Sequence, residues 1–155
     1  MLNITRVLVM IAVALLAGSY FSGAYVIVPA QRRLSASSYV EVEQANTRLG
    51  TVRFRILVFA TMLLQVALLV QLRPAAGMEF LLTVMGLILV VAATVITVRW
   101  VVPINATVHS WSSLAPPADW QILRQKWAQF HLVRTVLTCV ALIVQTLAYV
   151  PQQAR

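Results

Sequence analysis

Four long apolar runs divide this sequence, and they constrain the fold more than any other feature. They cover residues 7–28, 56–72, 80–98 and 132–150, so each is about 17 to 22 residues long. A helix of about 20 apolar residues, rising about 1.5 Å per residue, crosses the hydrocarbon core of a bilayer. We therefore expect an all-α integral membrane four-helix bundle that forms a single transmembrane domain over residues 1–155.

The composition agrees with a membrane-embedded chain. Of the 155 residues, 61% are hydrophobic and only 10% are charged, and the mean hydropathy is +0.86. A soluble domain of this length needs more charged side chains to cover its surface. The net charge of +8 does not indicate nucleic acid, because the arginines lie beside apolar runs instead of forming a basic domain. The expected partner is the lipid bilayer, and the single Cys139 excludes an internal disulfide.

The first apolar run is expected to form a spanning helix that ends at Pro29. The segment Ser22–Ala24 resembles the cleavage site of a signal peptide, but the apolar run continues through Val28 and exceeds the core of such a peptide. Small residues recur at a spacing of four and offer a surface for close helix packing: Ala14, Gly18 and Ser22, and also Ser19 and Gly23.

Polar segments and helix breakers mark the connections between the spans. Residues 31–55 are predicted to form the first connection, in which Tyr39–Arg48 is a short interfacial helix. Pro74 and Gly77 are typical of a tight second connection. Pro103 is expected to break the chain and open the third connection. Three polar residues of the first connection are candidate partners for arginines of the last helix, namely Glu41, Glu43 and Asn46.

The fourth helix is expected to begin outside the bilayer, near Ala118, and to continue to about Val150. Pro117, Ala118 and Asp119 are typical of a helix start, with a proline early and an acid in the first turn. Within the second span, Thr61 and Gln65 are four residues apart and are expected to face the bundle interior, because an amide facing lipid is costly.

The distribution of basic residues predicts the orientation in a bacterial inner membrane. Positively charged residues are retained on the cytoplasmic side. The side of the two termini holds three of them, and the side of the first and third connections holds nine. Both termini are therefore expected outside, and these two connections in the cytoplasm. The nine are Arg32, Arg33, Arg48, Arg53, Arg55, Arg99, Arg124, Lys126 and Arg134.

A stripe of aromatic and basic side chains begins the fourth helix. Trp120, Arg124, Trp127, His131 and Arg134 follow one another at spacings of four, three, four and three. Residues three and four apart share one face of a helix. Arginine stacks on aromatic faces, so the stripe is able to form a ladder. Its alignment is unusual for a helix that only anchors in lipid.

The stripe suggests proton-transfer chemistry. His131 stands between Arg124 and Arg134, whose positive charge should keep the imidazole neutral and able to accept a proton. The same arginines would stabilise an oxyanion, and Asn105 is able to donate a hydrogen bond beside them. The alternative is structural: a histidine bonded to a carbonyl or a lipid phosphate, arginines that anchor headgroups, and tryptophans of the interfacial belt.

Two segments resemble a family of small four-span membrane proteins that is grouped with the fungal anthrone oxygenases. They are residues 102–111, which begin Val-Pro-Ile-Asn and end in Trp111, and residues 119–135, which carry the stripe. The resemblance implies oxidation of an anthrone, or of another lipophilic aromatic, by dioxygen without a cofactor. It implies that His131 or His109 is the base and that Arg124, Arg134 and Asn105 hold the enolate oxygen. Three tryptophans would sandwich the flat substrate: Trp111, Trp120 and Trp127.

Two other functions remain open from the residues alone. One is a non-enzymatic membrane subunit, a homo-oligomer or part of a larger complex, in which the stripe binds a partner helix or anionic lipid. The other is a quinone or haem site in a redox complex. His109 and His131 are able to ligate a haem or a copper, although their spacing of 22 residues is no metal-site signature.

Overall fold

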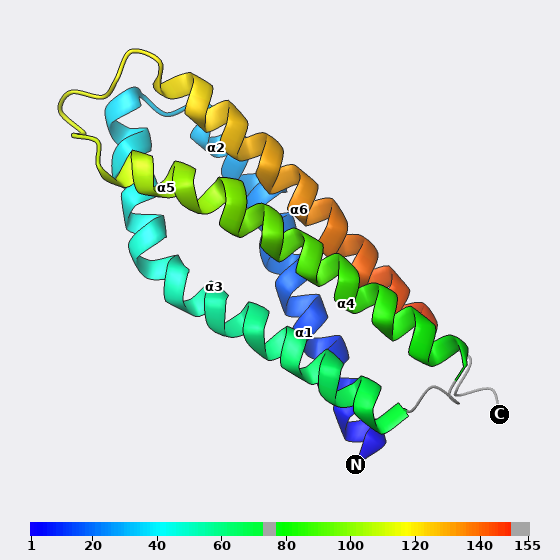
Figure 1. The fold of residues 1–155 in the computed structure, drawn as a ribbon. Helices are drawn as coiled ribbons and strands as arrows, with labels where there is room; N and C mark the ends of the chain where they lie inside the picture. The colour runs from blue at the N-terminus through cyan, green and yellow to red at the C-terminus, as the bar shows by residue number, and fades with distance from the viewer. Residues whose placement is uncertain (73–76, 150–155) are drawn as a thin grey trace.

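The computed structural model describes residues 1–72 and 77–149, and every regular element in them is helical. The elements are α1 (Leu2–Ser22), the π-helical turn η1 (Gly23–Ile27), α2 (Val28–Gln31), α3 (Ala36–Leu72), α4 (Met78–Ile96), the π-helical turn η3 (Thr97–Val101), α5 (Val102–His109) and α6 (Trp120–Tyr149). They join into four continuous rods packed side by side (Figure 1).

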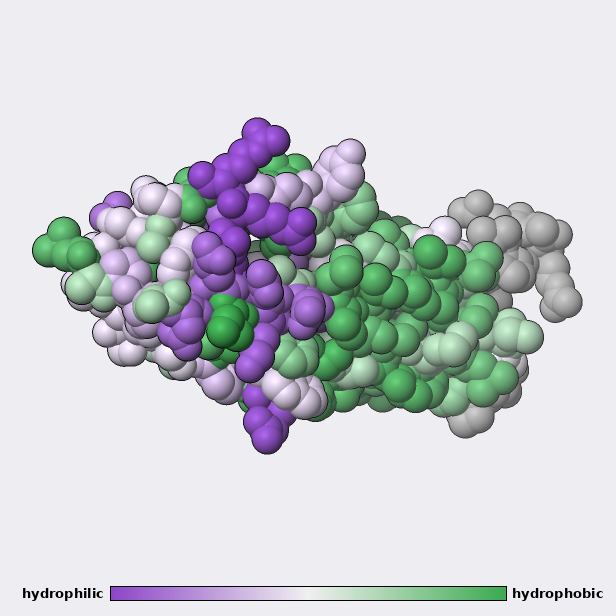
Figure 2. Space-filling view, turned by 90° about the horizontal axis from the view of Figure 1, so that it is seen from above, coloured by the Kyte–Doolittle hydropathy of each residue, from purple (hydrophilic) through white to green (hydrophobic). Residues whose placement is uncertain are grey.

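The four rods confirm the predicted fold class. They are Leu2–Gln31, Ala36–Leu72, Met78–His109 and Trp120–Tyr149, and each is long and apolar enough to span a membrane. Large apolar side chains also cover their outer faces, and Figure 2 shows a broad green hydrophobic belt on the visible face. Such a surface is unfavourable in water and is accepted by lipid.

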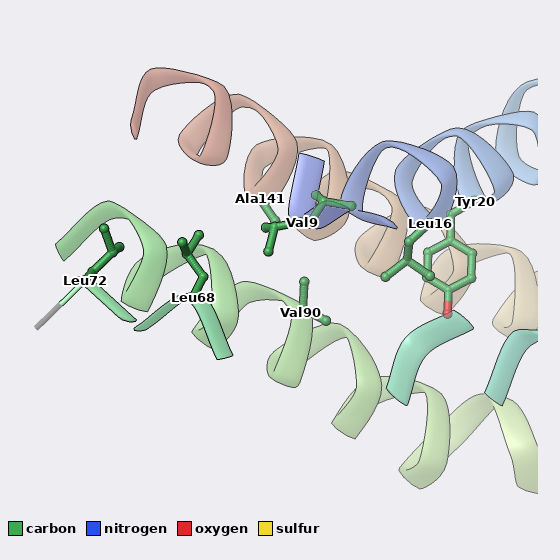
Figure 3. Close-up of a cluster of buried hydrophobic side chains, with 8 residues drawn as sticks. Val9, Leu16, Tyr20, Leu68, Leu72, Val90 and Ala141 are labelled. Carbon is green, nitrogen blue, oxygen red and sulfur yellow. The ribbon is translucent and has the colours of Figure 1, made fainter. Parts of the chain in front are cut away.

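The core of the bundle is a cluster of aliphatic side chains from all four rods. Val9 and Leu16 of α1, Leu68 of α3, Val90 of α4 and Ala141 of α6 are almost fully buried in it (Figure 3). The small-residue positions of the first rod divide between two environments. Gly23 is buried, whereas Ala14, Gly18 and Ser22 are exposed.

The prediction that Pro29 and Pro103 end helices is wrong, because a widened turn precedes each of them. The N–H of Val28 bonds to the oxygen of Gly23, and the N–H of Val102 bonds to the oxygen of Thr97, five residues back in each case. Proline lacks an N–H and crowds the carbonyl of residue i−4. A π turn just before it accommodates the ring without ending the helix, so the rods continue to Gln31 and His109.

The first connection is also shorter than predicted. The interfacial segment expected at Tyr39–Arg48 is the beginning of α3, which runs unbroken from Ala36 to Leu72. The hydroxyl oxygen of Ser35 accepts a hydrogen bond from the Ser38 N–H at 3.3 Å, as a helix N-cap does. Tyr39, Val40 and Glu43 are buried, so tertiary packing holds this polar stretch in helical form.

The other boundaries agree with the expectations where the structure describes them. The fourth helix begins at Trp120, two residues beyond the predicted start, and continues to Tyr149. Gly77 has the positive φ of 59° that glycine tolerates. The expectations for Pro74 and Val150 lie outside the described residues.

An ion pair that the sequence did not reveal joins α1 to α4 near the N-terminus. The Nε of Arg6 donates to Oε1 of Glu79 at 2.7 Å, and Nη2 donates to Oε2 at 2.6 Å. The side chain of Glu79 is only 2% exposed and that of Arg6 14%. This bidentate geometry is the strongest form of an arginine–carboxylate pair.

Candidate functional site

A partly open cavity of about 700 Å³ lies at the end of the bundle that carries α2 and α5. All four rods line it, and α3 bows away from the other three along its middle (Figure 1). The wall is largely apolar, and each rod adds polar side chains. These are Gln31, Glu43, Asn46, Thr97, Asn105, His131 and Arg134, among others.

His131 is held by hydrogen bonds on both ring nitrogens. Its Nε2 is 3.1 Å from the backbone oxygen of Tyr20, and its Nδ1 is 3.0 Å from Nε and 2.7 Å from Nη2 of Arg134. A guanidinium only donates hydrogen bonds, so Nδ1 is the acceptor and Nε2 carries the hydrogen that Tyr20 accepts. The ring is therefore a neutral imidazole with its basic nitrogen facing Arg134.

Gly23 makes room for this ring. A Cβ at Gly23 would overlap the imidazole and would lie 2.8 Å from its Cε1. The carbonyl oxygen of Tyr20, one turn earlier, also accepts a hydrogen bond from the Thr135 hydroxyl at 3.2 Å. The close approach of α1 and α6 at this level thus depends on the absence of a side chain at Gly23.

Arg134 is a buried cation with aromatic and neutral partners. It is 7% exposed, and Nη1 donates to the Thr97 hydroxyl at 3.3 Å. Its guanidinium carbon lies 4.6 Å from the ring centroid of Tyr20 and 5.7 Å from that of Trp127. Within residues 1–72 and 77–149 no carboxylate forms an ion pair with it. A buried charge without a direct counter-charge is costly, which is typical of a site that binds an anion.

Trp127 and Asn105 complete this side of the cavity. The Trp127 ring stacks on His131 with centroids 4.8 Å apart and an angle of 9° between the planes. Its indole N–H donates to Oδ1 of Asn105 at 2.8 Å. Asn105 therefore fixes the indole, which in turn fixes one face of the imidazole.

The other four predicted site residues do not line this cavity. Arg124 stacks on Trp120 at 4.7 Å and donates to the backbone oxygen of Gln31 at 3.1 Å. Trp111 and Trp120 pack around a separate buried cluster, and His109 is exposed at the end of α5. Arg124 precedes His131 by seven residues, about 10 Å along the helix axis, so the two ends of the stripe lie at different heights on α6.

The sequence did not reveal that Gln31 and Glu43 are central residues of the cavity wall. Both line the cavity and are only 3% and 4% exposed, and Nε2 of Gln31 donates to Oε2 of Glu43 at 2.8 Å. Glu43 was a candidate partner for arginines only because it lay in a polar connection. The spacing of four between Tyr39 and Glu43, read as part of a helix, was the signal that could have placed the acid on a buried face.

Residues 46–144 match the family model described as anthrone oxygenase. The chain belongs to the anthrone oxygenase family. No curated protein and no solved structure is significantly similar to it. The segment that matches the anthrone oxygenase family contains Asn105, Trp127, His131 and Arg134, whereas Gly23, Gln31 and Glu43 precede it.

The cavity of this anthrone oxygenase family member is lined by groups that are capable of acid–base chemistry. In the described parts of the chain, no three or more His, Cys, Asp or Glu side chains group as metal ligands would. His109 and His131 are not brought together, since His131 is buried in the cavity wall and His109 is exposed. A neutral imidazole, a guanidinium and a carboxylate around one largely apolar cavity are suited to proton transfer and to stabilising an anion.

Proposed function

We propose that this protein is a cofactor-independent oxygenase of an anthrone-like polycyclic, or of another lipophilic aromatic with an acidic methylene beside a conjugated ketone. The observation that carries the proposal is the buried pair of His131 and Arg134 on a cavity of about 700 Å³. Cavities of about 300–1,000 Å³ accept ligands of drug size, so three fused rings fit. Family membership supports the same chemistry.

The first step of the proposed reaction is removal of a proton from the methylene. His131 accepts this proton at Nδ1, and the C–H electron pair moves into the ring system to form an enolate. In the resting site Arg134 donates to that nitrogen. A substrate oxygen competes for the guanidinium, so binding both stabilises the oxyanion and frees the base.

The enolate then supplies all the electrons that dioxygen requires. It adds O₂ at the deprotonated carbon, and protonation gives a hydroperoxide. Loss of the second C–H proton breaks the O–O bond, forms the new carbonyl and releases water. One O₂ thus converts CH₂ to C=O and yields one H₂O, with no external reductant. We assign the second proton transfer to Glu43, whose carboxylate lines the same cavity.

The residues that lie outside the cavity take no direct part in this proposal. Arg134 serves as the oxyanion donor, in place of the predicted set of Arg124, Arg134 and Asn105. Trp127 alone contacts the flat substrate, with Asn105 as its support, in place of three tryptophans. His109 is no longer a candidate base, because it does not line the cavity.

Oxygen uptake by the purified protein tests the proposal. In lipid nanodiscs with a soluble anthrone, we expect uptake above the spontaneous rate, with ¹⁸O from ¹⁸O₂ in the new carbonyl. His131→Gln should lower the enzymatic rate by at least about 100-fold, and the matched variant His109→Gln should leave it unchanged. Wild-type protein that never exceeds spontaneous oxidation, or a folded His131→Gln protein with full activity, would refute the proposal.

A structural role for His131 is the second candidate, and one observation favours it. Both ring nitrogens are hydrogen-bonded, and one of these bonds clamps α6 to α1. In a non-enzymatic membrane subunit, His131→Gln would lower the melting temperature and leave any oxidation unaffected. The oxygen-uptake assay and a thermal melt on the same samples separate the two candidates.

We further infer that the protein lies in a bacterial inner membrane with both termini outside. Nine of the twelve basic residues belong to the side of the first and third connections, and positive charge is retained in the cytoplasm. The cavity end of the bundle would then face the cytoplasm. Reporter fusions at residues 34 and 114 and at the termini test this orientation, and the opposite labelling pattern would overturn it.

A further inference from the structure

A second cavity, of about 500 Å³, lies between η1–α2 and the first turns of α6. Arg32 and Arg124 line it together with three glutamines and four apolar residues. We propose that this cavity binds the phosphate headgroup of an anionic membrane lipid. The proposal is independent of the oxygenase reaction, since His131, Arg134 and Glu43 do not line this cavity.

The charge of the cavity selects an anion. Two guanidiniums face it, and none of the four acidic residues of the chain lines it. Arginine binds phosphate through two parallel N–H donors, which a carboxylate-free site leaves available. A zwitterionic headgroup also carries a phosphate, but its own cation would lie near the two arginines and weaken binding.

Arg124 is fixed in advance for such a ligand. Its guanidinium lies 4.7 Å over the Trp120 ring, and Nη1 donates to the backbone oxygen of Gln31 at 3.1 Å. A guanidinium has five N–H donors, and in the described part of the chain only this one hydrogen bond uses them. The remaining donors are held in place without the entropic cost of ordering a free side chain.

The apolar part of the wall indicates a lipid instead of free phosphate. Ala24, Val28, Ala128 and Leu132 line it, and Leu132 is 56% exposed. Leu132 follows Arg124 by eight residues, about 12 Å along the helix axis, which suits a charged head with an attached chain. Hydrophilic side chains gather in a band where the polar end of the molecule meets the hydrophobic belt (Figure 2), the level that headgroups occupy.

Competition between lipids tests the site. The protein is reconstituted in vesicles of phosphatidylcholine, and the relative affinity of spin-labelled phosphatidylglycerol over labelled phosphatidylcholine is measured. We expect wild type to prefer phosphatidylglycerol. Arg32→Gln and Arg124→Gln should each lower the preference about fivefold. The matched variants Arg33→Gln and Arg48→Gln remove exposed arginines that do not line the cavity and should leave the preference unchanged.

A second arginine variant and a competition with inorganic phosphate make the outcome of the lipid experiment unambiguous. Arg32 makes no side-chain hydrogen bond to the described residues, so Arg32→Gln is expected to fold even if Arg124→Gln does not. Millimolar inorganic phosphate should leave the bound lipid in place, because it lacks the chain that the apolar wall accepts. Displacement by inorganic phosphate would overturn the lipid assignment, and an equal loss in all four variants would overturn the site.

Discussion

The two ends of the bundle each hold a buried acid and a buried or largely buried arginine, but only one end brings them into contact. Near the N-terminus, Arg6 and Glu79 share two hydrogen bonds of 2.7 and 2.6 Å. At the other end, Glu43 and Arg134 line one cavity without an ion pair between them. Buried charges are normally paired, because an unpaired one is costly. The closed pair therefore joins helices, whereas the open pair leaves both groups on the wall of one cavity.

Arg134→Gln should give the largest effect, and on activity only. We expect the oxidation rate to fall about 1,000-fold, as for the loss of an oxyanion donor, while the fold survives because a buried cation without a direct counter-charge is removed. Oxygen uptake and a thermal melt check this. The control is Arg99→Gln, which removes an exposed arginine of the third rod. Near-normal oxygen uptake by folded Arg134→Gln protein would contradict a functional role for the unpaired arginine.

Glu79→Gln should show the opposite behaviour. The substitution leaves Arg6 without its carboxylate, which costs about 3–5 kcal/mol for a buried pair. Denaturant titration in mild detergent should show this loss, while the oxidation rate of the folded fraction stays normal. The double variant Arg6→Met with Glu79→Leu should recover most of the stability, since it removes both charges. Reduced catalysis without reduced stability would contradict a purely structural role for this pair.

Glu43→Gln should lower the rate about 100-fold, as expected for loss of an acid–base group. Stability should be unchanged or slightly higher, because glutamine is still able to accept from Gln31 and no charge is buried. The matched control is Glu41→Gln, an exposed acid two residues away on the same helix. Full activity in Glu43→Gln would assign both proton transfers to His131.

Gly23→Ala should have the smallest effect, about a tenfold loss of rate with a loss of stability of about 1–3 kcal/mol. The new Cβ would overlap the imidazole of His131 and push it off the Tyr20 carbonyl. Gly18→Ala is the control on the same helix, because nothing lies within 4 Å of a Cβ there. It should be neutral or stabilising, since alanine favours the helix. Equal effects of the two substitutions would deny that Gly23 positions His131.

The fold was predictable because the lengths of the apolar runs are read directly from the sequence. Over the described residues, each of the four apolar runs lies within one rod. The errors came where local rules meet tertiary packing. Pro29 and Pro103 break ordinary helices, but a π turn before each of them cannot be recognised from residue types. The polar start of α3 looked like a connection because its buried contacts to α5 belong to distant parts of the chain.

The candidate site was predictable only in part, for a related reason. Helical spacing correctly placed Trp127, His131 and Arg134 on one face. The same spacing joined Trp120 and Arg124 to them, although these two residues lie higher along the helix axis and do not line that cavity. Gln31, Glu43 and Gly23 come from helices whose arrangement no local pattern specifies.

The two π turns affect which side chains line the cavity. Each inserts one residue more per turn than an α-helix, so every side chain beyond it is turned by about 100° relative to a regular helix. Gln31 follows the turn at Gly23–Ile27, and Asn105 follows the turn at Thr97–Val101. Deleting a single residue, Val26 or Val98, would restore regular winding and turn the corresponding amide by about 100° from its present direction. The number of residues in each π turn thus sets the direction of these two side chains. That number matters to the site as much as the chemical identity of the side chains.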